Sequence, residues 1–115
     1  MESNEAVQSL GALAQGSRLA IFRLLVQAGP AGMAAGSIGE KLALPPATLS
    51  FHLAGLVRAG LAQSRQDGRF VIYSADYQSM NALIAFLTKN CCGEASCETL
   101  RGETYETTSR ARRRA

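Results

Sequence analysis

The sequence holds little of what many metal sites and enzymes depend on: it has a single histidine, and no cysteine precedes residue 91. No apolar run reaches the roughly 18 residues that a membrane-spanning helix needs. The first five residues, Met1–Glu5, are acidic where a signal peptide would be basic. At 115 residues the chain has room for one domain but not for two that pack independently. We therefore predict one soluble domain in the cytoplasm.

The composition is that of a globular protein, with 47% hydrophobic and 18% charged residues, and the net charge is +3. That charge is unevenly distributed. Residues 16–75 hold six basic and two acidic side chains, both flanking segments are acidic, and the last six residues carry four arginines. The basic middle indicates a polyanionic partner. For the terminal arginines we expect a solvated, mobile tail, with non-specific attraction to phosphates as the alternative.

Four helices are predicted in the first half of the chain. Apolar residues recur at helical spacing over residues 4–15 and again over 18–27, where Gly29-Pro30 supplies a stop. A third helix of about two turns is expected between Ala34 and Lys41, since Ser37 and Glu40 have the spacing of a capping box. Pro45-Pro46 then begins a helix that runs to Ala59. One stripe of this fourth helix is predicted to be buried: Leu49, Leu53, Leu56 and Val57.

The pattern then changes period. Residues 61–66 and 69–74 are strand-like, and Asp67-Gly68 between them is a strong signal for a two-residue hairpin turn. Asp76 can cap a last helix that runs to about Asn90. We divide the chain into a DNA-binding and dimerisation domain at 1–90 and a sensor loop with a basic tail at 91–115.

Two short helices joined by Ala43-Leu44-Pro45 and followed by a hairpin are the parts of a winged helix-turn-helix. Three segments, 13–19, 47–53 and 60–73, resemble the ArsR/SmtB family of bacterial metal-responsive repressors, and the resemblance extends over roughly residues 7–90. It implies a mainly α fold with a β-hairpin wing. It also implies a two-fold homodimer that binds double-stranded operator DNA.

A recognition helix places its N-terminal residues against base edges in the major groove. Arginines beside a wing tip suit phosphates or a minor groove, although two arginines around a turn can also be merely solvated. For His52 a purely structural role is the alternative. The predicted DNA-binding residues are Pro46, Ala47, Thr48, Ser50, Phe51, His52, Arg65 and Arg69.

A dimer is expected because a single recognition helix covers few base pairs, and two-fold pairing reads two half-sites. The resemblance implies that the first and last helices pair, and their surplus of apolar residues fits that role. The alternative is that these residues serve the core of their own protomer. The candidate dimer residues are Leu10, Leu83, Phe86 and Leu87.

All three cysteines, Cys91, Cys92 and Cys97, lie within seven residues after the last helix. Thiolates select soft ions, and a tetrahedral zinc site needs four ligands. Three thiols without a further histidine better match a three-coordinate ion, so we expect trivalent arsenic or antimony as inducer and no organic cofactor. The sequence resembles the arsenic-responsive subgroup with a C-terminal three-cysteine site. In other subgroups the thiols or zinc ligands stand where this chain has Ala34 and Gly36, or Asp76 and Gln78.

Other readings of the cysteines remain open. One is a soft divalent ion such as cadmium, lead or mercury. Another is a redox switch that pairs Cys97 with Cys91 or Cys92. Unligated thiols are a third. The ligation could lie within one subunit or between two. An enzyme such as an arsenate reductase is not expected, since no phosphate-cradling glycine loop lies near Cys91 and no spare histidine can act as base.

Overall fold

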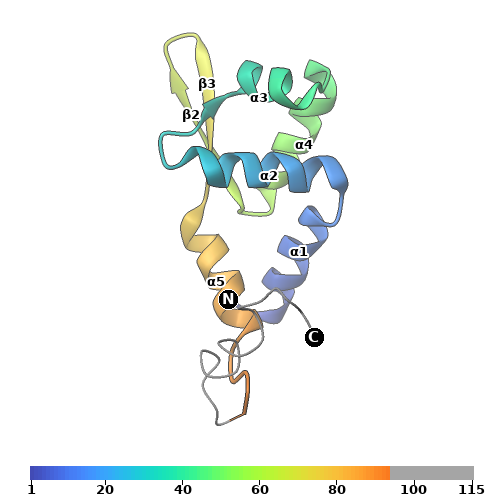
Figure 1. The fold of residues 1–115 in the computed structure, drawn as a ribbon, viewed down its shortest axis with the longest axis vertical. Helices are drawn as coiled ribbons and strands as arrows, with labels where there is room; N and C mark the ends of the chain where they lie inside the picture. The colour runs from blue at the N-terminus through green and yellow to red at the C-terminus, as the bar shows by residue number, and fades with distance from the viewer. Residues whose placement is uncertain (94–115) are drawn as a thin grey trace, which may run out of the picture.

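The computed structural model describes residues 1–93, which form a mainly α fold with a small sheet (Figure 1). Helix α2 crosses the middle of the molecule, with α3, α4 and the β2–β3 hairpin on one side and α1 and α5 on the other. Across these residues, no helix has the length and apolar character needed to cross a membrane. The elements in chain order are α1 (Ser3–Leu13), α2 (Gly16–Ala28), β1 (Met33–Ala34), α3 (Ala35–Leu42), α4 (Pro46–Arg58), β2 (Ala62–Asp67), β3 (Phe70–Ala75) and α5 (Tyr77–Leu87).

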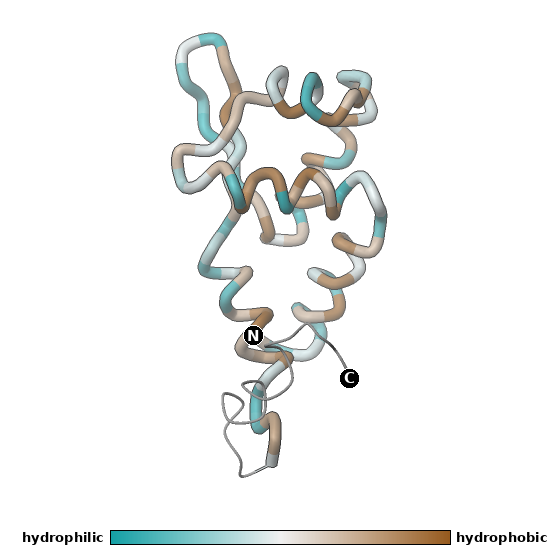
Figure 2. The backbone as a smooth tube through the Cα atoms, viewed as in Figure 1, coloured by the Kyte–Doolittle hydropathy of each residue, from teal (hydrophilic) through white to brown (hydrophobic). Residues whose placement is uncertain are grey.

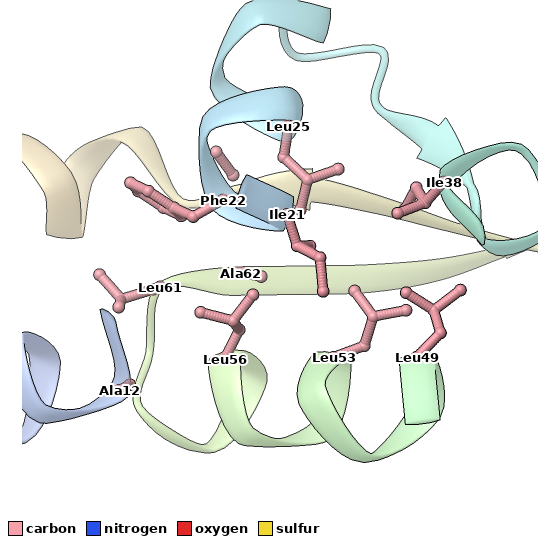
Figure 3. Packing of buried hydrophobic residues seen from close by; sticks show 11 residues of the cluster. Ala12, Ile21, Phe22, Leu25, Ile38, Leu49, Leu53, Leu56, Leu61 and Ala62 are labelled. Carbon is pink, nitrogen blue, oxygen red and sulfur yellow. The ribbon is translucent and has the colours of Figure 1, made fainter. Parts of the chain in front are cut away.

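The core lies between α2 and α4. Ile21 and Leu25 of α2 are fully buried, and the buried leucines of α4 point at them, with Ile38 of α3 beside them (Figure 3). Apolar residues accordingly dominate α2, and in the wing strand β2 is hydrophilic whereas β3 is largely apolar (Figure 2). The predicted stripe is confirmed at three of its four positions. The prediction is wrong for Val57, because its side chain is 39% exposed.

The turn between α3 and α4 follows from two local features. Ala43 adopts a left-handed conformation (φ 55°), which lets the N–H of Leu44 bond to the carbonyl of Gly39 at 3.0 Å. Pro45 is then extended and Pro46 stands at the first helical position, where no N–H is needed. The predicted capping box of Ser37 and Glu40 is wrong, since α3 starts before Ser37 and its N-cap makes no side-chain hydrogen bond.

The sheet contains a strand that the sequence did not predict. Its order is β1-β3-β2, all antiparallel, with Met33 opposite Tyr73 and Ala34 opposite Ile72. β1 has only two residues, and Gly32 precedes it with φ 77°. A Cβ on Gly32 would lie 2.4 Å from the carbonyl oxygen of Tyr73, so only glycine permits this close approach.

The turn of the wing lies one residue later in the chain than predicted. β2 extends to Asp67 and pairs it with Phe70, so the two turn residues are Gly68 and Arg69, not Asp67 and Gly68. Gly68 has φ 63° while Arg69 is not in the left-handed region. A glycine at the first central position is what a type II′ turn requires. The shift places Arg69 at the tip of the wing.

Helix α5 is anchored at its start. The Asp76 carboxylate accepts a hydrogen bond from the N–H of Ser79 at 3.0 Å, which confirms the predicted cap. The Tyr77 hydroxyl donates to the carbonyl of Val26 at 2.9 Å, which joins α5 to the C-terminal end of α2. The helix ends at Leu87, earlier than the predicted Asn90, and turns occupy residues 88–93. Asn90 itself has φ 59°, a left-handed conformation that ends a helix.

Neighbouring residues of α4 should differ sharply in their contribution to stability. Leu56→Ala leaves a cavity beneath α2 and should lower the free energy of unfolding by about 3 kcal/mol. Val57→Ala removes a half-exposed side chain and should cost less than about 1 kcal/mol. Urea unfolding followed by circular dichroism measures both. Equal losses would contradict the described orientation of α4.

Candidate nucleic-acid interface

The N-terminal half of α4 presents one face to solvent. Leu49 and Leu53 are buried against α2, so the residues between and before them point away from the core. Phe51 is the largest of these outward side chains, with 63% exposure. This face combines hydroxyl groups, which can donate or accept hydrogen bonds, with apolar groups that can meet a thymine methyl. Its exposed residues are Pro46, Ala47, Thr48, Ser50 and Phe51.

His52 lies differently from the other predicted recognition residues. It is only 8% exposed, and its Nδ1 accepts a hydrogen bond from Nε of Arg18 at 3.2 Å. This bond requires the imidazole proton to be on Nε2. The ring packs edge-on against Phe51, with 5.5 Å between ring centroids. In this structure His52 therefore supports the recognition helix from inside, which is the structural alternative considered for it.

Sequence reasoning missed Arg18 as a partner of the recognition helix. It lies in the first turn of α2, and its Cζ is 5.4 Å from the ring centroid of Phe51, a cation–π distance. Gly55 makes room for it, since a Cβ there would lie 2.6 Å from Cζ of Arg18. The signal in the sequence that could have indicated this contact is Gly55 itself, because glycine is unfavourable inside a helix unless another group needs the space. Arg18 thus orients the exposed Phe51 through His52 and the ring face.

The two wing arginines have different surroundings. Nη2 of Arg65 donates to the carbonyl of Ala31 at 2.9 Å, which ties β2 back to the loop before β1. Arg69 is exposed at the turn, and within the described residues it makes no hydrogen bond or ion pair. Phe70 beside it is 57% exposed, an aromatic that the sequence did not single out. Of the two arginines, Arg69 is the one whose guanidinium can meet a phosphate without giving up a bond to another residue of the range 1–93.

The candidate dimer residues divide into exposed and buried ones. Leu10 of α1 and Leu87 of α5 are 42% and 56% exposed, and Phe86 is partly exposed. Leu83 is only 7% exposed, so it packs within its own protomer. Two residues that the sequence did not single out complete an apolar stripe on each helix. We call these four exposed residues the α1/α5 stripe: Val7 and Leu10 on α1, Ile84 and Leu87 on α5.

The candidate sensor lies at the end of the described residues. Cys91 and Cys92 are partly exposed and occupy the turns after α5, where the N–H of Cys91 bonds to the carbonyl of Thr88 at 3.0 Å. Cys91 is disulfide-bonded. Cys97 and the terminal arginines lie outside residues 1–93. Over that range no three potential metal ligands come together, so the predicted three-thiol site is only partly in view.

Comparison with known proteins places this geometry in a family. The Helix-turn-helix domain family matches residues 13–65. The chain is 33% identical to the transcriptional activator HlyU of Vibrio cholerae over 94 residues, which are 80% of this chain and 84% of HlyU. An ArsR-like transcriptional regulator from Rhodococcus sp. RHA1 superposes with a TM-score of 0.66 at 27% identity, covering 75% of this chain and 78% of that one.

A further solved structure, a possible transcriptional regulator for arsenical resistance, has a TM-score of 0.61 and 28% identity, and covers 70% of this chain and 80% of that one. The fold, the exposed recognition helix and the wing agree with these likenesses. The chain belongs to the winged helix-turn-helix transcriptional regulators of the ArsR/HlyU type.

Proposed function

We propose that this regulator is a repressor that binds a palindromic operator as a homodimer and is released when trivalent arsenic or antimony binds Cys91, Cys92 and Cys97. The observation that carries the proposal is the position of the thiols. Two of them lie in the turns directly after α5, the helix that bears half of the α1/α5 stripe. One structural neighbour is described as a possible transcriptional regulator for arsenical resistance, which supports the choice of ion.

The exposed face of α4 enters the major groove, and the wing follows the adjacent backbone. Thr48 and Ser50 supply hydrogen-bonding groups to base edges, and Phe51 supplies an apolar surface for a thymine methyl. Arg69 at the wing tip contacts phosphate or the minor groove. The excess of basic residues in 16–75 attracts the duplex and gives the binding its salt dependence.

The α1/α5 stripe is the dimer surface. Both helices carry exposed apolar residues three positions apart, and burying these side chains in a dimer removes them from water. α1 and α5 lie on the side of α2 away from α3 and the wing, so pairing there leaves both recognition helices free (Figure 1). Two copies related by a two-fold axis then read half-sites about one helical turn apart.

Three thiolates satisfy a trivalent arsenic or antimony ion, whose lone pair takes the fourth direction. Binding requires deprotonated and reduced cysteines, so it releases protons and needs Cys91 out of its disulfide. Gly93 has φ 58°, a conformation that lets the chain turn sharply just after the Cys91-Cys92 pair. Closing the ligand loop acts on the end of α5, next to Leu87 of the dimer surface.

The route from thiols to DNA runs through α2. α5 is bonded to the end of α2 by Tyr77, and the buried face of α4 rests on α2. A tilt of α5 therefore changes how the two recognition helices are spaced. Linkage requires DNA and ion to weaken each other's binding by the same factor.

A second candidate is a thiol redox-sensing repressor, and the disulfide at Cys91 favours it. In that reaction two thiols and one peroxide molecule yield one disulfide and two waters. The same end of α5 would be constrained by a covalent bond instead of an ion. A third candidate, sensing of cadmium, lead or mercury, uses the same thiolates.

Substitution of the two wing arginines should have different effects, on DNA binding for Arg69 and on stability for Arg65. Arg69→Gln should lower the salt slope of duplex binding by about 0.9, the loss of one phosphate contact, and leave stability within about 0.5 kcal/mol of wild type. Arg65→Gln should cost about 1 kcal/mol of stability because the bond to Ala31 is lost. Fluorescence anisotropy at several salt concentrations and urea unfolding test this. An unchanged slope for Arg69→Gln would remove the wing from the interface.

Charge on the α1/α5 stripe should break the dimer. Ile84→Glu and Leu87→Glu each bury a carboxylate in an apolar contact, twice per dimer, and should weaken dimerisation at least about 100-fold. Leu19→Glu on α2, another exposed apolar position, is the matched control and should leave the dimer intact. Sedimentation equilibrium distinguishes the species. A monomeric wild type, or a dimer resistant to both changes, contradicts this surface.

Arsenite should release the reduced protein from its upstream DNA. At fixed salt with a thiol reductant, operator affinity should fall by at least about tenfold, the lower range of allosteric coupling. Cys91→Ser, Cys92→Ser and Cys97→Ser should each bind DNA as wild type does and lose the response. Cadmium and peroxide, tested separately, identify the other two candidates. If arsenite leaves the affinity unchanged, arsenic sensing is excluded, and loss of DNA binding by a serine variant indicates a structural thiol.

A further inference from the structure

A polar hollow of about 380 Å³ lies where α1, α2 and α4 meet. It is bounded by two arginines, one glutamine and small residues, and among the described residues no carboxylate lines it. Arg18 and Arg58 both belong to the basic middle segment; Arg18 contacts His52 and Phe51 through its Nε and its planar face, and Arg58 has no contact with the wing or the recognition face described above. The residues that line it are Gln8, Gly11, Ala12, Arg18, Gly55, Arg58 and Ala59.

Arg18 is held in this hollow before any ligand arrives. Its Nε is used by His52 and its planar group lies against Phe51, so the guanidinium has a defined orientation. Among residues 1–93, no hydrogen bond uses its Nη1 or Nη2. Gly55 is the reason that the guanidinium can lie this close to α4, since both Nη atoms are within 3 Å of where a Cβ would stand. Two N–H-bearing nitrogens therefore remain for another acceptor.

The second cation of the hollow is also uncompensated. Arg58 is in the last turn of α4, and within the described residues neither guanidinium forms an ion pair with a carboxylate. Glu5 lines a neighbouring hollow together with Arg58, but one of its carboxylate oxygens accepts the N–H of Glu2 at 2.9 Å. Two positive groups facing one cavity repel each other unless an anion lies between them.

We infer that this hollow binds an oxyanion of the phosphate class, with Arg18 and Arg58 as its cationic ligands and Gln8 as a further donor. Guanidinium groups present paired N–H donors that match the oxygens of a phosphate. The anion is either a backbone phosphodiester of bound DNA or a free phosphate. The first source rests on DNA binding by this regulator, whereas the second does not.

Two variants test the hollow without removing its core contacts. Arg58→Gln removes one cation, and Arg23→Gln, an exposed arginine of α2 that does not line the hollow, is its charge-matched control. Gly55→Ala keeps every charge but pushes the flexible end of Arg18 away. Gly36→Ala on α3, with nothing within 4 Å of its Cβ, is the control for adding a methyl to a helix.

The free-anion arm measures the melting temperature in inorganic phosphate against chloride at equal ionic strength. The DNA arm measures the slope of log K against log salt for duplex binding, which should fall by about 0.9 when one phosphate contact is lost. Loss of the phosphate-dependent shift in Arg58→Gln and Gly55→Ala, with both controls retaining it, identifies a free phosphate. A lowered slope in these two variants alone identifies the DNA backbone.

If both variants match wild type in both arms, the inference is overturned. If the melting shift and the salt slope of the two variants change no more than those of the two controls, general electrostatics explains the effect and the inference is likewise overturned. A wild-type protein that binds no DNA would contradict the proposed function, while the phosphate arm would still decide whether the hollow binds an anion.

Discussion

The packing of the recognition helix, α4, on α2 is the constraint on which the rest of the molecule depends. Leu53 and Leu56 of α4 are almost completely buried against Ile21 and Leu25 of α2, and this packing decides which side of α4 faces solvent. Rotation of α4 about its axis would expose leucines and bury Thr48 and Ser50 at a cost of several kcal/mol. The chemistry of the outward face is thus fixed by apolar contacts on the inward one.

Helix α2 also lies between the two groups of elements to which we assign different functions, DNA binding on one side and dimerisation on the other. The sheet, α3 and α4 pack on one side of it, and α5 is bonded to its C-terminal end through Tyr77. The first turn of α2 carries Arg18, which reaches Phe51 and His52 of the recognition helix. Helix α2 therefore links α5, through Tyr77, to Phe51 and His52 of α4, through Arg18.

Much of this architecture could be predicted from the sequence because helical periodicity and turn residues are local signals. The order of the helices, the buried leucines of α4 and the cap at Asp76 depend on neighbours within a few positions. What could not be predicted depends on contacts across the chain. β1 depends on Gly32, which lets it approach Tyr73, and the partner of His52 is Arg18, which lies 34 residues earlier in the chain. Val57 falls on the predicted stripe by spacing, but no other element of residues 1–93 covers its side chain enough to bury it, and it stays 39% exposed.

If thiol ligation after α5 and operator binding by α4 are coupled as we propose, the coupling must be reciprocal. Arsenite affinity of the reduced protein is measured by titration with and without saturating operator DNA, at one salt concentration. We expect DNA to weaken arsenite binding by the same factor by which arsenite weakens DNA binding. Equal arsenite affinity in the presence and absence of DNA would contradict it.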